Sequence, residues 1–380
     1  MSSYLETTVI ELSIPTQVRS EIPFIVDDFT LALHLGVRCK TLWACVITKE
    51  NLYKRFSIRK SNGKRRILHA PMRILKYVQK RIDQVILKKL PVLDCVGAYV
   101  TGRSCRYSAE RHSGHAVRIG MDLKDFFPTH TKAQVRRFFH ETCGYSHFVS
   151  GLLADVCTTV DKIPADKSKL FGETRKRHFV PQGSPASPSL CNLMAQERLD
   201  KPLLAFLEGT GWVYTRYSDD LTFSHPEEKS RKEVDAFIDR VRHFIRLGGY
   251  RTNMRKTKVQ RRVWRQKMLG MVVNEHPNIP RDVFYRYKAI LYNCIRDGFL
   301  VNAIRYGQGF EDAPQSFPSH LQGKISYFHT VNPTKAKKLS VLLARAVAAE
   351  RRRKGEDAVD ETIDGDFPTL HTFNDDLQSG

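Results

Sequence analysis

The segment YTRYSDDLTFS, residues 214–224, places two adjacent carboxylates at a reversal of the chain. Side chains alternate with the period of two that is typical of strands up to Tyr217 and again from Leu221, so the segment predicts a tight hairpin with Asp219 and Asp220 at its tip. Adjacent aspartates are usually structural, because their side chains bond the backbone of turns. Two carboxylates that cannot separate also repel each other unless a cation or a proton lies between them, so the pair is also a candidate metal site.

The charge of the chain is strongly unbalanced. It has 62 Lys and Arg against 40 Asp and Glu, and eight of the acids lie in residues 355–380, which contain no Lys or Arg. The preceding body therefore carries a net charge of +30, which points first to nucleic acid as the partner. No run of residues approaches the length of a membrane span, so a membrane surface is the weaker interpretation. The acidic end is predicted to be a disordered tail.

The length and the cysteines narrow the class of protein further. A chain of 380 residues, 41% of them hydrophobic, buries a sizeable core and predicts two or three subdomains. Its eight cysteines form no CxxC pair and have no histidine spacing suited to zinc, so we expect reduced thiols in a cytosolic protein. The beginning, MSSYLETTVIEL, lacks the features of a signal peptide, and we expect the protein to stay in the cell that makes it.

A third carboxylate is expected at the end of an upstream strand. In AVRIGMDLKDFFPTH, residues 116–130, apolar side chains alternate from Val117 to Met121, and Asp122 follows on the opposite face. Asp125 and two phenylalanines come next, before Pro128 ends any regular continuation. The sequence therefore presents Asp122 at a strand terminus.

The sequence predicts two further elements, a helix between the two aspartate segments and a strand after them. In VPQGSPASPSL, Ser187 followed by Pro188 has the form of a helix N-cap and first helical residue, and the helix is predicted to run to about Lys201, before Pro202. Gln182 and Gly183 remain on the loop before it. After a Gly-rich turn and a basic segment, KMLGMVVN predicts another strand, from Met268 to Val273.

These five signals in this order closely resemble the palm of a reverse transcriptase. DLKDFF resembles motif A, PQGSPASP motif B, YSDD motif C, NMRKT motif D and LGMVVN motif E, and residues 56–82 resemble the fingers hairpin. Bacterial retron reverse transcriptases fit best, because they are compact and carry NAxxH before motif A and VTG at motif E. This chain has SAERH at residues 108–112 and MLG at residues 268–270, so Ser replaces Asn and Met-Leu replaces Val-Thr.

The resemblance implies an α+β right-hand polymerase fold with fingers, an antiparallel palm sheet and a helical thumb. The amphipathic basic stretches after Pro280 and after residue 333 are predicted to be thumb helices. The expected divisions are an N-terminal helical extension at 1–50, fingers at 51–115, palm at 116–275 with an interleaved fingers segment at about 140–185, thumb at 276–354 and the acidic tail at 355–380.

The chemistry of a polymerase gives these carboxylates a role. Two Mg²⁺ ions stabilise the attacking and leaving oxygens of nucleotidyl transfer and are held by oxygen ligands. The resemblance implies that Asp122 and Asp219 bind both metals and that Asp220 lies close by. Lys256, in the motif D position, is a candidate for protonating or electrostatically assisting the departing pyrophosphate; the alternative is a solvated basic side chain.

The resemblance also assigns nucleotide and RNA contacts. Arg66 is the predicted triphosphate contact, with Lys64 and Arg65 as alternatives in the same basic run. Phe127 is the predicted steric gate that leaves no room for a 2′-hydroxyl; a buried core phenylalanine is the alternative. Gln182 and Gly183 are expected to line the nucleotide, the glycine permitting close backbone approach. Predicted RNA or primer contacts are His112, Leu269 and Gly270, although His112 is by default a core histidine.

A retron enzyme would act on a structured non-coding RNA encoded beside it. The resemblance implies synthesis of single-stranded DNA from deoxynucleotides, primed by a 2′-hydroxyl of that RNA and leaving a branched RNA–DNA product. It further implies an effector protein encoded nearby, a role in antiphage defence, a bacterial cytoplasmic location and no membrane partner. The alternatives are a diversity-generating or abortive-infection reverse transcriptase, or a non-catalytic RNA-binding scaffold that keeps the fold.

Overall fold

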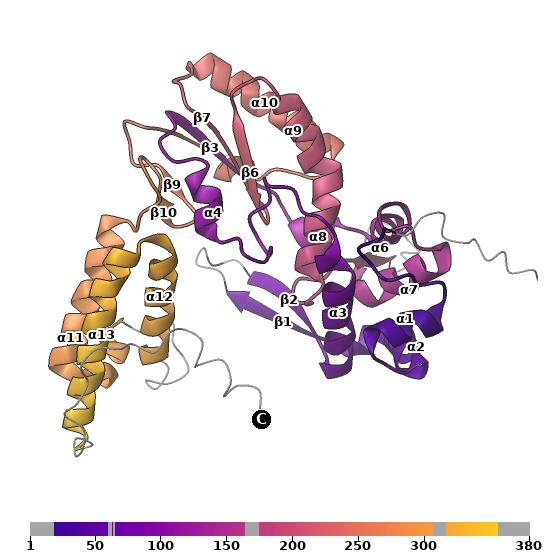
Figure 1. Cartoon of the computed structure of the whole chain (residues 1–380), viewed down its shortest axis with the longest axis horizontal. Coiled ribbons are helices and arrows are strands. Elements are labelled where there is room, and N and C mark those ends of the chain that lie inside the picture. Colours follow the sequence, from indigo (N-terminus) through magenta and orange to yellow (C-terminus); the bar gives the residue numbers. More distant parts are fainter. Residues whose placement is uncertain (1–18, 60–62, 64, 164–174, 307–316, 356–380) are drawn as a thin grey trace, which may run out of the picture. The chain divides into compact units, whose positions relative to one another are not determined.

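The computed structural model describes residues 19–59, 63, 65–163, 175–306 and 317–355. The chain forms two compact units, residues 1–277 and 278–380, and each is described by itself (Figure 1).

The first unit combines helices with small antiparallel sheets. Its α-helices are α1 (Asp28–Leu35), α2 (Cys39–Ile47), α3 (Arg73–Val85), α4 (Cys105–Glu110), α5 (Phe126–Thr129), α6 (Lys132–Arg137), α7 (His147–Cys157), α8 (Ser187–Ala195), α9 (Lys201–Leu207) and α10 (Arg231–Leu247). Its 3-10 and π-helical turns are η1 (Lys49–Leu52), η2 (Leu87–Lys89), η3 (Phe138–Thr142), η4 (Gln196–Asp200) and η5 (Met254–Lys256). Its strands are β1 (Tyr53–Arg59), β2 (Arg65–Pro71), β3 (Val117–Asp122), β4 (Thr159–Ile163), β5 (Arg175–Phe179), β6 (Val213–Tyr217), β7 (Asp220–His225), β8 (Lys258–Arg261), β9 (Lys267–Met268) and β10 (Met271–Val272).

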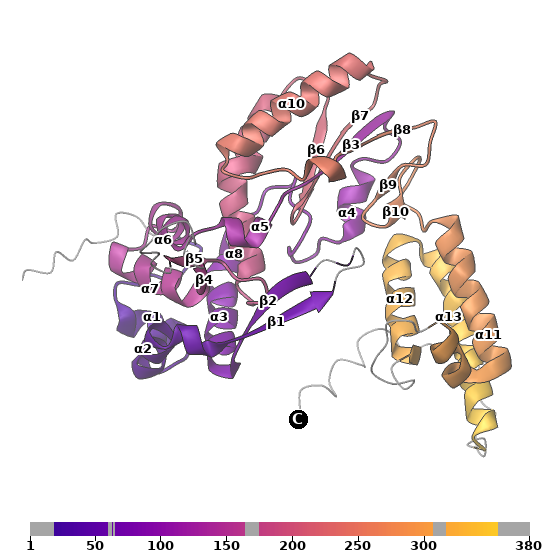
Figure 2. The same cartoon turned by 180° about the vertical axis from the view of Figure 1, so that it is seen from behind.

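The central sheet has the strand order β6-β7-β3-β8, and every neighbouring pair is antiparallel. In both views α9 and α10 lie along one side of this sheet and α4 lies on the other (Figure 1, Figure 2). The predicted strand ending at Asp122 and the predicted hairpin around Asp219 are both confirmed, as β3 and β6–β7. Residues of β3 are buried on both faces, because helices or loops cover each face of the sheet.

Helix α10 illustrates how the sequence fixes an element at the side of this sheet. Ser230 and Glu233 form a capping box at its start, in which each side chain bonds the backbone of the other residue. Buried residues recur three or four positions apart at Val234, Ile238 and Val241, so one stripe of the helix joins the core.

Three two-stranded sheets flank the central one: β1–β2, β4–β5 and β9–β10. The β1–β2 hairpin pairs Tyr53 with Pro71 and Arg59 with Arg65, which confirms the hairpin predicted for the segment that resembles the fingers.

The helix predicted from Ser187 differs from the structure at both ends. Ser187 is the first helical residue and Ala186 is the cap, a shift of one position. The prediction that the helix stops before Pro202 is wrong, because α8 passes through the π-helical turn η4 into α9. Pro202 lies just after the π-helical turn, at the point where the regular α-helical bonding is already interrupted.

The single strand predicted for residues 268–273 is also wrong. Lys267–Met268 and Met271–Val272 form a hairpin, with Leu269 at φ 48° and Gly270 at φ 83° between them. Two consecutive residues with positive φ are the requirement of a type I′ turn. The Met-Leu-Gly-Met run reads as apolar and extended, but its glycine allows the reversal.

The second unit contains helices α11 (Arg281–Tyr306), α12 (Phe317–Val331) and α13 (Pro333–Arg353). Helix α13 packs against both of the others, and buries the predicted apolar residues Leu339, Leu342 and Leu343. Helix α11 is broken at Gly298, which has φ 84° and ψ 168°. Glu350 of α13 accepts a hydrogen bond from the backbone N–H of Phe299 at 3.3 Å, so the break is stabilised by the neighbouring helix.

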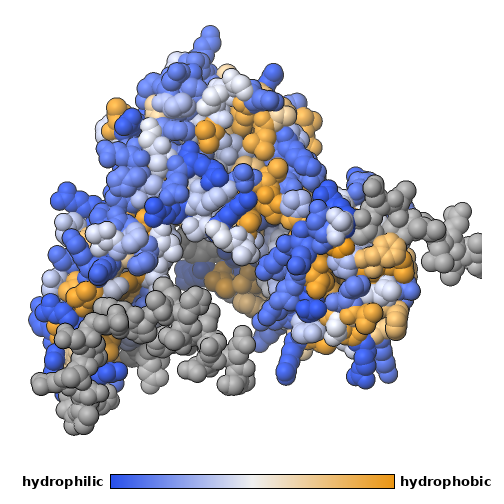
Figure 3. Space-filling model, viewed as in Figure 1, coloured by the Kyte–Doolittle hydropathy of each residue, from blue (hydrophilic) through white to orange (hydrophobic). Residues whose placement is uncertain are grey.

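The surface carries hydrophobic side chains over α1, α2 and α7 (Figure 3). They are Phe24, Phe29, Leu33, Ile47 and Phe148. Among the described residues no single helix is long and apolar enough to cross a membrane, and α1 with α2 meets the length and composition only as a pair bent by 102°. All eight cysteines are free, as predicted.

Candidate active site

Three aspartates come together where β3 ends and β7 begins. Asp122, the last residue of β3, lies directly opposite Asp220, the first residue of β7. Asp219 occupies the two-residue turn between β6 and β7, and its carbonyl accepts a hydrogen bond from the N–H of Leu123 at 2.8 Å. The register of two strand pairs therefore sets the positions of all three carboxylates. The sequence predicts this grouping correctly.

The turn that carries Asp219 is strained. Ser218 has φ 60°, a left-handed conformation that is uncommon for a residue other than glycine. Desolvation raises the pKa of Asp219, and the charge of Asp122 raises this pKa further. Desolvation, followed by the charges of Asp219 and Asp122, raises the pKa of Asp220 to about 6. The three carboxylates thus repel one another in this site.

Lys256 is the cation that meets this charge. Its Nζ donates to Oδ2 of Asp122 at 2.7 Å, and this hydrogen bond raises the pKa of Lys256. The segment that presents Lys256 is tied to the same aspartate, because Asn253 N–H donates to the carbonyl of Asp122 at 2.8 Å. Lys256 is half exposed, so it has room to move between partners.

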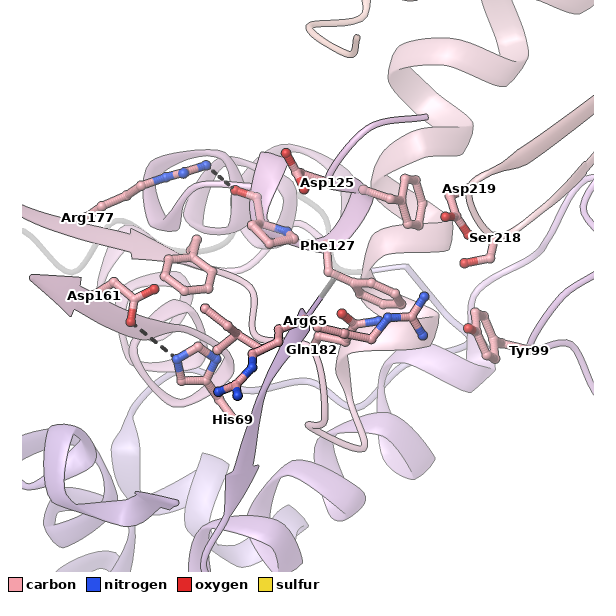
Figure 4. Close-up of a pocket in the computed structure, with 15 residues that line it drawn as sticks. Arg65, His69, Tyr99, Asp125, Phe127, Asp161, Arg177, Gln182, Ser218 and Asp219 are labelled. Atoms are coloured by element: carbon pink, nitrogen blue, oxygen red, sulfur yellow. Dashed lines mark hydrogen bonds and ion pairs between the residues drawn. The ribbon is translucent and has the colours of Figure 1, made fainter. Parts of the chain in front are cut away.

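A cavity of about 460 Å³ adjoins the aspartates. Figure 4 shows its walls: Asp219 and Ser218 on one side, Phe127 and Asp125 above, and Arg65 and Gln182 across the middle. Arg66 lines it as well, together with Tyr99, His69, Asp161 and Arg177. The cavity joins the carboxylate cluster to a set of guanidinium groups from β2, which suits a ligand with several phosphates.

Phe127 and Gln182 both line this cavity, so the structure brings these two predicted residues together with Asp219 and Arg66. Phe127 is half-buried and packs edge-to-face on Phe126, at 5.5 Å between ring centroids. Phe126, rather than Phe127, is the buried core member of the pair. One edge of Phe127 is thus left facing the cavity (Figure 4).

Gly183 approaches the backbone of β2 closely, and its predicted place beside the nucleotide stays a prediction. It adopts φ 124°, and a Cβ at this position would lie 2.8 Å from the carbonyl oxygen of His69. The adjacent Gln182 carbonyl accepts a hydrogen bond from His69 N–H at 2.9 Å. The close backbone approach that needs a glycine is therefore to β2, and it fixes the loop before α8 against the β1–β2 hairpin.

The predicted RNA contact of His112 is wrong. Its side chain is fully buried, with Nδ1 2.6 Å from Ser224 Oγ and Nε2 2.8 Å from Thr215 Oγ1. Desolvation, the largest cause, lowers the pKa of His112 to about 3, so the ring is neutral. The alternative of a core histidine holds: it joins the loop after α4 to strands β6 and β7.

Leu269 and Gly270 are not part of the cavity lining. Lys64 lies outside the described residues. Leu269 and Gly270 form the β9–β10 turn, where Leu269 is half-buried and Gly270 is exposed. Their roles as primer contacts stay predictions.

The sequence reasoning missed the support beneath the carboxylates. Arg216 of β6 and Asp200 of η4 are both fully buried and form an ion pair at 2.6 Å. Arg216 also donates to Asn192 Oδ1 at 2.8 Å. The signal in the sequence is an arginine between Tyr214 and Tyr217 of a predicted strand, three residues before Asp219, because an arginine in a buried strand is rare unless it is paired.

Comparisons with known proteins decide the family. The sequence model described as "Reverse transcriptase (RNA-dependent DNA polymerase)" matches residues 58–273. The chain is 34% identical over 317 residues to the retron Mx65 reverse transcriptase of Myxococcus xanthus, covering 83% of this chain and 70% of that relative. The chain belongs to the bacterial retron reverse transcriptases. It is an RNA-directed DNA polymerase, and an RNA template is its partner.

Other similar proteins are also retron reverse transcriptases. The retron Mx162 reverse transcriptase of Myxococcus xanthus is 30% identical over 75% of this chain and 59% of its own length. The retron Ec86 reverse transcriptase of Escherichia coli is 28% identical over 70% of this chain and 77% of its own length. Among solved structures, a Sicinivirus 3Dpol RNA dependent RNA polymerase matches 82% of this chain and 66% of its own with a TM-score of 0.44 and 11% identity.

Reverse transcriptases use divalent metal ions, and the donors of this member fit such an ion. Within the described chain no three His, Cys, Asp or Glu side chains already form a ligand cluster. The three aspartates nevertheless supply only oxygen donors, as hard divalent cations require. Asp122 already binds one cation, the Lys256 ammonium, and desolvation, followed by neighbouring carboxylate charge, raises the pKa values of Asp219 and Asp220. A divalent ion would relieve that repulsion.

Proposed function

We propose that this reverse transcriptase copies part of a cognate structured non-coding RNA into single-stranded DNA, primed from a 2′-hydroxyl of that RNA. The similarity to retron reverse transcriptases, at 34% and 28% identity to two of them, supports this substrate class. The same similarity supports a bacterial cytoplasmic location, a neighbouring effector protein and a role in antiphage defence. Deoxynucleotides are the second substrate, and the branched RNA–DNA molecule is the product.

Asp122, Asp219 and Asp220 would hold two Mg²⁺ ions. When bound, these ions neutralise charge on the attacking hydroxyl, the α-phosphate and the leaving pyrophosphate. The contribution of the chain is to fix the donors: strand register places Asp122 opposite Asp220, and the Leu123 N–H holds the carbonyl of Asp219. The placement of these three donors, with Asp219 lining a cavity of about 460 Å³, is the observation that carries the proposal.

Lys256 would give its proton to the pyrophosphate as it leaves. Its ammonium is charged at neutral pH, as that of an ordinary lysine is, and the hydrogen bond to Asp122 raises its pKa further. It is half exposed and already within 2.7 Å of a catalytic carboxylate. A charged donor at that distance is suited to general-acid work on a phosphate oxygen.

The cavity would hold the incoming deoxynucleotide. Arg66, with Arg65 beside it and Lys64 in the same run, would bind the triphosphate, since both arginines line the cavity. Phe127 would close the space beside the sugar and exclude a 2′-hydroxyl. Gln182 would line the nucleotide from the opposite side, while Gly183 holds the loop against β2.

The unit of residues 1–277 would then provide the fingers and palm, and the helical unit of residues 278–380 the thumb. We assign the β1–β2 hairpin and the segment of about 140–185 to the fingers, the four-stranded sheet to the palm, and residues 1–50 to an N-terminal extension. Helices α11 and α13 expose many basic side chains, among them Arg281, Arg286 and Arg345, which suit a duplex backbone.

The test is to express the gene with its native flanking DNA in bacteria and to sequence small DNA before and after debranching. Wild type is compared with the double variant Asp219→Ala, Asp220→Ala. A discrete single-stranded DNA joined to RNA, absent from the variant, is expected. If no such DNA forms while the purified protein extends a DNA primer on RNA, the retron product is refuted and another priming mode takes its place.

A further inference from the structure

The turn between β8 and β9, residues 262–266, exposes a tryptophan far from the cavity. Trp264 is 75% exposed and its neighbour Val263 is 80% exposed. Trp43 and Trp212, the other tryptophans of the chain, pack against the hydrophobic core. An exposed indole gains no hydrophobic stabilisation from the fold, so the side chain is available to bind a ligand and would be stabilised by that contact.

The backbone of this turn is held by hydrogen bonds with the side chain of Asn274. The side chain of Asn274 donates to the carbonyls of Arg262 at 3.0 Å and Trp264 at 2.8 Å, and accepts from the N–H of Gln266 at 2.8 Å. Gln266 is itself fully buried and donates to the carbonyl of His115. One amide thus satisfies three backbone groups of a short turn. The backbone that carries the indole is therefore held in one conformation, which lowers the entropy cost of binding.

The charge around Trp264 is positive. The segment RRVWRQK, residues 261–267, has four basic residues and no acid. Arg261 forms an ion pair with Glu228 at 2.6 Å, and Arg262, Arg265 and Lys267 are exposed to solvent. An aromatic face between guanidinium groups matches a base flanked by phosphates.

The turn lies at the end of the sheet away from the aspartates. Strand β8 is the edge strand beside β3, and Arg261 pairs with Val117 (Figure 2). Asp122 is five residues further along β3, which at about 3.3 Å per residue corresponds to about 17 Å. A ligand at Trp264 is therefore separate from the reacting nucleotide.

We propose that the Trp264 turn binds an unpaired nucleotide of the RNA, with the indole stacked on the base and Arg262 and Arg265 on the adjacent phosphates. This inference rests on the proposed function, because it takes the RNA as the ligand. Stacking selects unpaired bases, since the faces of paired bases in a duplex are covered by their neighbours. The turn would thereby recognise a loop or single-stranded segment of the RNA that is not being copied.

The experiment measures RNA binding by fluorescence anisotropy, with purified full-length protein in EDTA and without deoxynucleotides. The probes are a labelled RNA hairpin with an eight-nucleotide loop and a blunt RNA duplex of the same stem. Trp264→Ala is expected to weaken hairpin binding by about 5- to 150-fold, the range that base–aromatic stacking provides. Duplex binding should change by less than about twofold, because phosphate contacts dominate it.

Two variants serve as controls. Trp264→Phe keeps an aromatic face and should retain hairpin binding to within about threefold. Phe29→Ala removes an aromatic side chain of comparable exposure, 67%, on α1, and should leave binding of both RNAs unchanged. Because both side chains are exposed, the thermal unfolding midpoint should not move in either variant.

Three outcomes overturn the proposal. If Trp264→Ala binds the hairpin with wild-type affinity, the turn does not bind a nucleotide. If the variant loses affinity equally for the hairpin and the duplex, the turn does not select unpaired bases. Unchanged RNA binding with lost association to phosphatidylglycerol vesicles would assign the turn to a membrane instead. Extension of oligo(dT) on poly(rA) is measured in parallel at saturating template: since Trp264 is remote from the aspartates, its substitution should leave the maximal rate unchanged, and any loss of RNA affinity should raise only the template concentration that is needed. A wild type that fails this extension would refute polymerisation while the binding result stands.

Discussion

Arg216 and Asp200 form an ion pair in which neither side chain is accessible to solvent. Arg216 donates through Nε to Oδ1 at 2.9 Å and through Nη2 to Oδ2 at 2.6 Å, the two-pronged geometry that suits a carboxylate. Tyr214 donates to the same Oδ1 at 2.7 Å. Arg216 Nη1 lies 3.4 Å from the carbonyl oxygen of Ser218, the strained residue before Asp219. The pair thus connects the π-helical turn η4 to the turn that carries a catalytic aspartate.

Breaking this pair should be costly. Arg216→Met leaves the carboxylate of Asp200 buried without its partner, and the free energy of unfolding should fall by about 3–5 kcal/mol. The double variant Arg216→Met, Asp200→Leu removes both charges and should recover most of that loss. Urea unfolding of the two variants measures the difference. A double variant no more stable than Arg216→Met would contradict this account.

Gly183 should not tolerate a side chain. Gly183→Ala combines a φ of 124° with a Cβ 2.8 Å from the backbone oxygen of His69, which cannot move without shifting β2. We expect a loss of about 1–3 kcal/mol in unfolding free energy, the cost of a strained backbone position. Because Gln182 lies in the same loop and lines the cavity, the KM for deoxynucleotides should rise too. Gly209→Ala is the matched control at positive φ, since a Cβ there meets nothing within 4 Å and the residue lies away from the cavity lining.

Phe127 should set the choice of sugar. Phe127→Ala opens the cavity beside Asp219, and ribonucleotide incorporation relative to deoxynucleotide incorporation should rise at least tenfold, about 1.4 kcal/mol of discrimination. Single-nucleotide primer extension with each sugar measures the ratio of kcat/KM values. Phe139→Leu, a change in a buried ring that does not line this cavity, should lower stability without changing this ratio. If Phe127→Ala leaves the ratio of kcat/KM values for the two sugars unchanged, Phe127 is not the steric gate.

The order of motifs predicted the carboxylate cluster because strand register is fixed by alternation and turn chemistry, both of which are local. Asp122 and the Asp219 hairpin therefore fell where the sequence placed them. The errors lie where long-range packing decides. A π-helical turn let the helix pass Pro202, and a left-handed Leu269 turned an apolar run into a hairpin. The partners of buried polar groups, such as Asp200 and His112, come from distant segments that a single sequence does not pair.

The metal-free carboxylate cluster should make stability depend on pH. The pKa of Asp220 is raised from 3.8 to about 6, so the folded protein binds the proton more tightly than the unfolded chain does. Its contribution to stability is fully present below pH 3.8 and is lost as the pH rises to about 6. In EDTA, the unfolding midpoint of wild type should therefore fall relative to that of Asp220→Asn across this window. The difference should be small, because solvent screens the exposed residue.

Adding Mg²⁺ above pH 7 should reverse the order. An ion that binds only the folded state raises the unfolding midpoint with its concentration, and wild type has the carboxylate that Asp220→Asn lacks. Lys256→Met provides the matched control: it removes the cation that pairs with Asp122, so the metal-free midpoint should fall while the gain on adding Mg²⁺ grows. Differential scanning fluorimetry over pH, with and without Mg²⁺, measures all three proteins. If the difference in unfolding midpoint between wild type and Asp220→Asn depends on neither pH nor Mg²⁺, these carboxylates neither repel one another nor share a metal.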